Sequence, residues 1–390
     1  MARSMTWNAS TVATSCIGWF IVACFMSSLF SQDARPSVFL VSSSLQLPST
    51  TKSVDPRQLS ASEIVKLAAA RSATSRLVSA DSHSRFHSAK SRGQDEERQI
   101  QDALQSAISF RLRQNSSANA LKLHYGIAAC IHAEHLLVET LSLLNVQSSA
   151  QIQLVEKGIP IPDPLLIERL KTDLEDKRIN NQSKLSVLRT QLSVLIGEEN
   201  ACSHSPIESS TIHPSDSDVC DRILEALDCR CDLVIMKRLR NSIGENTLEV
   251  WDTIGALMSG VPAPLKCVSF WSKFIRSKCS QAENQRAVAA RRAWLEELIA
   301  ERTRQIAMDV AVAFEKKKSA ALRWVKQGEQ IANWDTRIAQ LEKLSEVHGN
   351  LAEQLSSKLN RLQLQGERIE RWLDWHQANT DLMLAIGCEQ

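Results

Sequence analysis

This 390-residue chain contains few of the residues that interrupt helices. Glycine occurs 12 times and proline 10 times, well below the shares of roughly 7% and 5% that typical proteins carry. Tyrosine occurs once, as Tyr125, and aromatic residues make up 5% of the sequence. A sheet-rich fold needs many turns and many β-branched or aromatic residues. These shortages exclude a mainly β protein and disfavour an α/β nucleotide-binding fold.

The chain also lacks an excess of either charge. Its 46 Lys and Arg residues against 44 Asp and Glu residues leave a net charge of +2, spread without a basic stripe. Nucleic-acid binders need a concentrated positive surface, so we expect no nucleic-acid partner. The abundant Ala, Leu, Gln, Glu, Arg and Lys residues are good helix formers. The sequence therefore predicts an all-α fold of long helices with little or no β structure.

Motifs of enzymatic chemistry are missing as well. We find no Gly-rich phosphate loop, no nucleophile elbow and no paired carboxylates in a recognisable setting. His132 and His135 are three residues apart, whereas the zinc-protease motif needs two histidines four apart. Four tryptophans could line a ligand path, but packing between long helices is favoured for Trp324, Trp334, Trp372 and Trp375. We therefore expect no catalytic residue, no metal and no cofactor.

The first thirty residues are predicted to be a targeting segment. Arg3 precedes an apolar stretch from Cys16 to Met26, which suits the core of a signal peptide. Within this stretch, Ile21-Val-Ala-Cys24 resembles a bacterial lipobox and makes Cys24 the lipidation candidate. Ordinary cleavage of a signal peptide and an uncleaved anchor from about residue 11 to 30 are the alternatives. Each of them exports the chain, and residues 31–57 follow as an extended linker.

Residues 58–200 are predicted to form a first helical repeat. The Ser60-Ala-Ser-Glu63 pattern is a capping box that opens a helix of about twenty residues, through Leu77. A proline-free helix runs from about residue 95 to 157, where glycine and two prolines end it. Another helix begins after Asp163 and ends at Gly197, with leucines at the three- and four-residue spacings of a coiled-coil seam.

A second repeat, residues 219–390, follows a polar linker at residues 201–218. Arg230 lies 159 residues after Arg71, and Gly387 lies 190 residues after Gly197. Another proline-free helix runs from about residue 283 to 348, and the glycine after it lies 191 residues beyond Gly158. Chance rarely reproduces such landmarks in order, so the chain contains an internal duplication.

These landmarks resemble the TolC-like outer membrane efflux family over roughly residues 58–390. The segment from Val155 to Leu166 resembles the tip of the family's helical hairpins. Leu195-Ile-Gly197 and Leu384-Ala-Ile-Gly387 resemble the Leu- and Gly-containing ends of its repeats. The segments around Arg71 and Arg230 occupy the place of its repeat-opening element, although the family's proline is missing from both.

The resemblance implies a passive conduit in a tripartite efflux or type I export system. Such a conduit is a homotrimer in the cell envelope, at the outer membrane or in the periplasm, and works with a periplasmic adaptor and an inner-membrane pump. Alanine-rich faces, with Ala307 and Ala311 among them, leave a second packing surface for self-association. The predicted partner-docking tips are Gly158, Ile159, Pro160, Ile161, Pro162, Asp163, His348, Gly349 and Asn350.

One departure from the family opens an alternative. The family inserts a β-hairpin between the short and the long helix of each repeat, and a membrane-spanning strand needs about nine to eleven residues. Here the first interval, residues 81–94, is polar without an alternating apolar face. The rival hypothesis is therefore an exported periplasmic coiled-coil scaffold, derived from that family, that does not transport.

Overall fold

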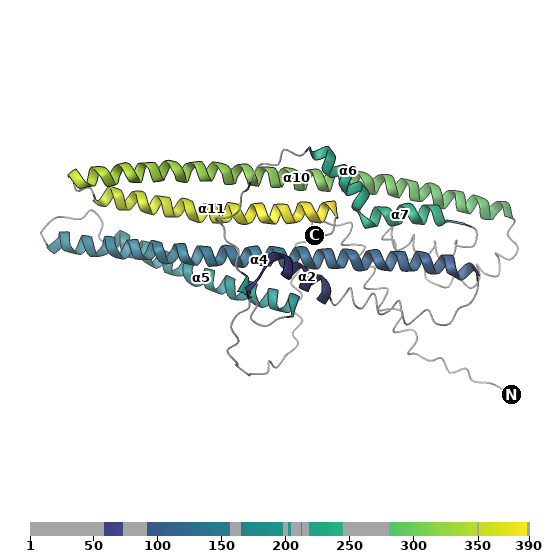
Figure 1. The fold of residues 1–390 in the computed structure, drawn as a ribbon, viewed down its shortest axis with the longest axis horizontal. Helices are drawn as coiled ribbons and strands as arrows, with labels where there is room; N and C mark the ends of the chain where they lie inside the picture. Colours follow the sequence, from purple (N-terminus) through teal and green to yellow (C-terminus); the bar gives the residue numbers. More distant parts are fainter. Residues whose placement is uncertain are drawn as a thin grey trace, which may run out of the picture. The chain divides into compact units, whose positions relative to one another are not determined.

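The fold is almost wholly helical in the part of the chain that the computed structural model describes, which is residues 58–72, 92–156, 165–197, 202–203, 212, 218–244, 281–348 and 351–387. Along the chain the elements are β1 (Gln58–Leu59), α2 (Ala61–Arg71), α4 (Arg92–Glu156), α5 (Leu165–Ile196), β2 (Cys202–Ser203), α6 (Val219–Cys229), α7 (Cys231–Ser242), α10 (Gln281–His348) and α11 (Leu351–Ile386) (Figure 1). The two short strands pair in parallel, Gln58 with Cys202 and Leu59 with Ser203. This architecture confirms the predicted all-α class with little β structure.

The described residues belong to two compact units. Residues 92–102, 236–244 and 281–299 form one unit, and the other described residues form the second. In the first unit, Arg292 Nη2 donates a 2.7 Å hydrogen bond to the carbonyl oxygen of Ile243, beside buried Leu295. Each unit contains segments of both sequence repeats. The boundaries of the repeats therefore remain a prediction that the two units do not test.

The long helices begin and end within a few residues of their predicted limits. α4 has 65 residues, or about 98 Å at the rise of an α-helix, and α10 has 68 residues. Both were expected from the absence of proline and from the glycines that follow them. Such limits depend on local sequence alone, which explains the agreement.

The short helix α2 differs from the prediction in its length. Its capping box is present: Glu63 N donates to Ser60 Oγ at 3.3 Å, and Ser60 N donates to Glu63 Oε2 at 2.8 Å. The helix has 11 residues and ends at Arg71, with Ser72 as its C-cap, instead of continuing to Leu77. Serine and threonine compete with the helix for backbone hydrogen bonds, and they follow Arg71 at positions 72, 74 and 75.

Two apolar cores hold the second unit together. The first joins β1 and α2 to α4 and α5, through Leu59, Ile64, Ala68, Ala120, Ile127, Leu192 and Ile196. The second joins α4 to α10 and α11, through Ala128, Ala129, Ile212, Ala321, Trp324 and Trp372. The burial of Trp324 and Trp372 confirms the packing role predicted for these two tryptophans.

In this unit the long helices lie side by side in the order α10, α11, α4, α5 (Figure 1). Gln327 of α10 donates to Glu367 of α11 at 3.0 Å. Further along the row, α4 pairs with α11 through Lys122 and Asp381 at 2.5 Å, and α4 pairs with α5 through Glu134 and Arg178 at 2.7 Å. These contacts place α10 and α5 at the two ends of the row. Consecutive helices of the row are antiparallel.

Within the described residues, one helical stretch is long and apolar enough by composition to cross a membrane. It is Ser106–Ser149 of α4. The same stretch supplies Ala120 and Ile127 to the first core and Ala128 to the second. Other apolar residues of the same stretch, Val138 and Val146, are exposed.

Candidate functional site

A cluster of buried charged side chains lies where the second repeat opens. Its centre is Arg230, the single residue that separates α6 from α7. The backbone of Arg230 is extended, with φ of −64° and ψ of 110°, so its side chain leaves the helix direction. Arg230 is 3% exposed and Arg302, which enters the cluster from α10, is 7% exposed. Charges this deeply buried need partners, because an isolated ion loses its hydration.

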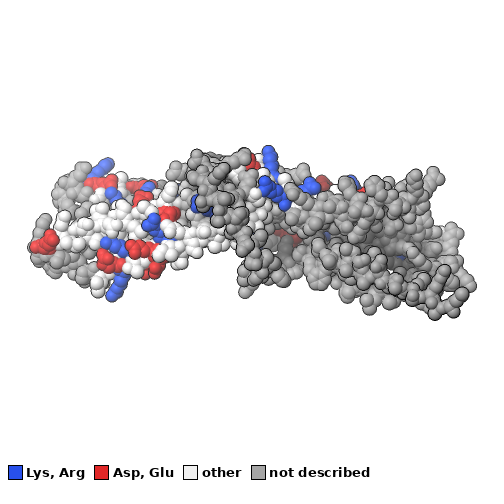
Figure 2. All heavy atoms as spheres, turned by 90° about the horizontal axis from the view of Figure 1, so that it is seen from below, with Lys and Arg blue, Asp and Glu red and all other residues white. Residues whose placement is uncertain are grey.

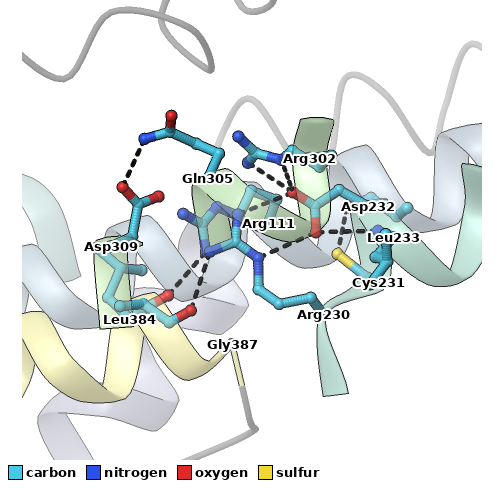
Figure 3. Close-up of polar contacts among 12 residues, drawn as sticks. Arg111, Arg230, Cys231, Asp232, Leu233, Arg302, Gln305, Asp309, Leu384 and Gly387 are labelled. Atoms are coloured by element: carbon cyan, nitrogen blue, oxygen red, sulfur yellow. Dashed lines mark hydrogen bonds and ion pairs between the residues drawn. The ribbon is translucent and has the colours of Figure 1, made fainter. Parts of the chain in front are cut away.

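Asp232 supplies the negative charge of this cluster (Figure 3). Arg230 donates to both carboxylate oxygens, from Nε to Oδ1 at 3.0 Å and from Nη2 to Oδ2 at 2.8 Å. Arg302 donates twice to Oδ2, from Nε at 3.0 Å and from Nη2 at 2.7 Å. One carboxylate thus bridges the start of α7 to α10 with four charge-assisted hydrogen bonds.

The same cluster receives the C-terminal end of α11. The last carbonyl groups of a helix have no partner within the helix and carry its negative dipole. Here Arg230 Nη1 donates to Ala385 O at 3.0 Å, and Arg111 Nη1 donates to Leu384 O at 3.0 Å. Gln114 Nε2 donates to Gly387 O at 2.7 Å. Three side chains from α4 and the α6–α7 junction therefore hold this helix end.

The charges in the cluster shift one another's pKa values. Burial alone would raise the pKa of Asp232, but its hydrogen bonds to Arg230 and the charges of both arginines hold that pKa well below its usual range. Burial alone would lower the pKa of Arg230, but the hydrogen bonds and charge of the Asp232 carboxylate outweigh burial and raise the pKa of Arg230 above its usual value. Burial and the nearby charge of Arg230 lower the pKa of Arg111 to about 10. Asp232, Arg230 and Arg111 are therefore ionised at neutral pH.

The first repeat has a simpler version of this arrangement. Arg71 Nη1 donates to the carbonyl oxygen of Gly197, at the end of α5. Both terminal glycines have a positive φ, 65° at Gly197 and 79° at Gly387, a conformation that favours glycine. A Cβ at Gly387 would also lie 2.7 Å from Arg230 Cδ. In both repeats, therefore, an arginine donates a hydrogen bond to a carbonyl group at the end of a helix that a glycine terminates.

We interpret the cluster as a structural joint. Its charged groups are paired with each other or with helix ends. Sequence reasoning singled out Arg71, Arg230, Gly197 and Gly387 as repeat landmarks but did not bring them together. It included Asp232 only as part of the repeat-opening segment around Arg230, and it missed Arg302 and Arg111. The available signal was the pairing of one arginine with one terminal glycine in each repeat.

A second group of polar side chains lies between α4 and α11. His124 is 1% exposed, and His376 stacks on Tyr125 with ring centroids 3.9 Å apart. The ring of Trp372 lies 5.6 Å from that of Tyr125. Burial lowers the pKa of His124 to about 4. Burial and the proximity of His124 lower the pKa of His376 to about 4 as well. Both imidazoles are therefore neutral at pH 7.

The sequence-predicted site residues lie mainly outside the described residues. This holds for Cys24 and for the first tip, residues 158–163, as well as for Gly349 and Asn350. His348 is the last residue of α10. In the part of the chain that the structure describes, no three His, Cys, Asp or Glu residues gather in a metal-binding arrangement.

Comparison with known proteins identifies the fold. No protein-family model matches the sequence, and no curated protein matches it. Solved structures do match. The open state of the MtrE outer membrane channel of Neisseria gonorrhoeae is similar with a TM-score of 0.59 at 13% identity, over 85% of this chain and 89% of that one.

Two further structures agree. A structure of CusC, from work on the conformational changes that accompany its folding and transmembrane channel formation, matches with a TM-score of 0.57 at 10% identity. The match covers 87% of this chain and 96% of that one. The CmeC outer membrane channel of Campylobacter jejuni matches with a TM-score of 0.52 at 11% identity, over 76% and 68%. The chain therefore has the helical fold of outer membrane channels, which confirms the TolC-like architecture predicted from its repeats.

Proposed function

We propose that this chain is a conduit of the outer-membrane-factor type, a passive component of a tripartite efflux or type I export system. The observation that supports this most is a fold shared with outer membrane channels over most of both chains. The row of four long helices, with packing surfaces left at both ends, suits a wall element of a tube. In this role the chain uses no energy source of its own, because an inner-membrane pump and a periplasmic adaptor supply energy and specificity.

The proposal places the protein in the cell envelope as a homotrimer. Residues 1–30 direct export, and Cys24 carries the lipid anchor. A single acyl chain binds membranes weakly, so stable attachment needs several chains or a second membrane contact. Mass spectrometry of the mature N-terminus tests this step. A mature protein that still contains an unmodified peptide from Met1 to Cys24 would refute lipidation.

Conductance decides whether the protein is a conduit. Purified trimer inserted into planar lipid bilayers should give discrete conductance steps, and the same preparation after heat denaturation should give none. Size and circular dichroism establish beforehand that the sample is folded and trimeric. A folded trimer without conductance at any voltage would refute the conduit.

The second candidate is a periplasmic coiled-coil scaffold. It is favoured by the polar character of residues 81–94, the last of which belong to α4. Residues 81–91 and the corresponding region of the second repeat, residues 245–280, lie outside the described residues. Protein released with the periplasmic fraction after Cys24→Ala, still trimeric and without conductance, would support this candidate.

The hairpin tips are proposed to dock the adaptor. Replacing Ile159 and Ile161 with Asp should leave helicity and oligomer size unchanged and abolish capture of the adaptor. The matched control is the same change at Ile152, an exposed residue of α4, which should retain capture. If the double variant co-purifies with the adaptor at the wild-type yield, the tip has only a structural role.

A further inference from the structure

Lys317 of α10 is a half-buried cation that has no carboxylate partner among the described residues. Other lysines of the described chain do have such partners: Lys122 pairs with Asp381, Lys171 with Glu168 and Lys358 with Glu342. Figure 2 shows the same tendency on the face that it draws, where basic and acidic side chains lie together in mixed clusters. A charge that loses part of its hydration needs a compensating charge. The described residues supply none to Lys317.

Arg222 of α6 adds a second positive charge near Lys317. Burial and the charge of Arg222 lower the pKa of Lys317, and no acidic group of the described residues raises that pKa. Arg222 has a partner of its own, because its Nη1 donates a hydrogen bond to Glu225 at 2.7 Å. The charge of Lys317 is therefore the one left without compensation where α6 approaches α10.

Two polar atoms of α11 beside Lys317 also lack partners. Trp375 Nε1 and His376 Nε2 are both buried, and neither has a hydrogen-bond partner within the described residues. An indole nitrogen can only donate, and an imidazole donates from Nε2 in one of its two neutral tautomers. Buried polar groups are nearly always hydrogen-bonded, so groups without partners indicate a bound ion or water.

The three groups are close enough to bind one small anion. The rings of Trp375 and His376 are in edge-to-face contact with their centroids 4.7 Å apart, and Lys317 Nζ lies 5.8 Å from the centroid of the Trp375 ring. A carboxylate accepts bonds of about 2.8–2.9 Å on two oxygens, so it joins nitrogen atoms roughly 6–8 Å apart. The ring separations bring the nitrogen atoms within this reach.

The charge and the access of the site favour a monoanion. One negative charge balances the single charge of Lys317, whereas a dianion would leave an excess of buried charge. Both ring nitrogens are shielded from solvent in this structure. The Lys317 side chain lies over the Trp375 ring, and its flexible four-carbon stem is the part that moves to admit a ligand.

We propose that Lys317, Trp375 and His376 bind the carboxylate of a small organic acid between α6, α10 and α11. Lys317 supplies the positive charge, and the two ring nitrogens donate hydrogen bonds to the carboxylate oxygens. The site lies within a single chain. The inference therefore goes beyond the proposed function and does not depend on it.

A carboxylate of this chain is the alternative source. Ile212 packs with Trp372 in the second core, and Asp218 is the N-cap of α6. Asp216 lies between Ile212 and Asp218 in the sequence and outside the described residues. The experiment must therefore separate a bound acid from the side chain of Asp216.

The indole N–H signals in the NMR spectrum of isotopically labelled protein test direct binding. Acetate is the probe, and it replaces chloride at pH 7 and constant ionic strength. The signal of Trp375, identified by its absence from Trp375→Phe, should move downfield and saturate. The signal of Trp334, whose ring lies against Arg337 instead, should stay in place. A Trp375 signal that acetate does not move in the wild type would overturn the proposal.

Two neighbouring lysines provide a matched pair of variants. Lys317→Met keeps an apolar stem over the Trp375 ring and removes the charge, so it should weaken acetate binding at least tenfold. Lys318→Met changes an exposed lysine and should retain the wild-type affinity within twofold. Circular dichroism establishes that each variant is folded. Equal affinities of the two variants would overturn the site.

Asp216→Asn decides between the two sources. Acetate binding that is the same in the wild type and in Asp216→Asn would support a free organic acid. Binding that appears only in Asp216→Asn would show that Asp216 fills the site, and tighter binding of phosphate than of acetate would overturn the assignment to a carboxylate. Acetate binding without conductance would support the site and refute the conduit, whereas conductance without acetate binding would do the reverse.

Discussion

Acid should loosen the packing of α4 against α11, because two neutral histidines are buried between these helices. His124 and His376 each have a pKa of about 4 in the folded chain, against about 6.5 in an unfolded one. Between these two values the unfolded chain binds more protons than the folded chain. Stability therefore falls as the pH falls from 6.5 towards 4. Each histidine should lower the free energy of unfolding by about 2 kcal/mol between pH 7 and pH 5.

The groups around these histidines limit what else can titrate. Tyr125 stacks on His376. Trp375 contacts the ring of His376 edge to face, with the two ring centroids 4.7 Å apart. Lys317 of α10 lies 5.8 Å from the centroid of the Trp375 ring, and its pKa is lowered by burial and by the charge of Arg222. Lysine stays protonated throughout the pH range concerned. Carboxylates that are stabilised by ion pairs lose most of their contribution below a pH of about 5.

The assay is the guanidinium unfolding midpoint at pH 7 and at pH 5, followed by circular dichroism at one protein concentration. His376→Phe keeps the stacking on Tyr125 and removes one titrating group, so its midpoint should fall by only about half as much as that of the wild type on acidification. The control His135→Gln changes an exposed histidine and should retain the wild-type dependence. An equal fall in the wild type and in His376→Phe would refute the reasoning.

Two substitutions test the joint at the end of α11. Asp232→Asn leaves two buried arginines without their carboxylate and should lower the free energy of unfolding by about 3–5 kcal/mol. The control Asp335→Asn breaks an exposed ion pair and should lower it by less than about 1 kcal/mol. Equal losses of the two variants in chemical denaturation would contradict this prediction. Gly387→Ala places a Cβ at positive φ, 2.7 Å from Arg230 Cδ, and should cost about 1–2 kcal/mol. At Gly244 a Cβ would meet nothing within 4 Å, so Gly244→Ala is the neutral control. An unchanged unfolding midpoint for Gly387→Ala would show that glycine is not required at position 387.

The sequence was sufficient for the features that depend on local interactions. The scarcity of glycine and proline predicted the long helices, and the glycines at 197 and 387 predicted where α5 and α11 end. Both glycines do have the positive φ of a helix C-terminus. Such ends are predictable because the residues that cause them are adjacent in the chain.

The sequence was insufficient where the structure depends on distant contacts. Asp232 and Arg302 are 70 residues apart, and no periodicity connects them. Likewise, the carbonyl group that Arg71 binds lies 126 residues away in sequence.

The joint also shows how the duplicated halves have come to differ. The spacing of 191 residues between the long helices aligns Arg111-Leu-Arg-Gln114 with Arg302-Thr-Arg-Gln305. Arg111 and Arg302, two of the three arginines in the cluster, therefore occupy equivalent positions. The spacing of 159 residues between the short helices places Ala73 where the second repeat has Asp232.

Without an aspartate in its own repeat, Arg111 binds a carbonyl at the end of α11, and Gln114 binds another. The end of α11 is therefore held by side chains of both repeats, whereas the end of α5 receives Arg71. The two equivalent arginines thus have different partners: Arg302 binds Asp232 of its own repeat, and Arg111 binds the end of α11. The end of α11 is therefore one of the places where the two halves of the chain contact each other.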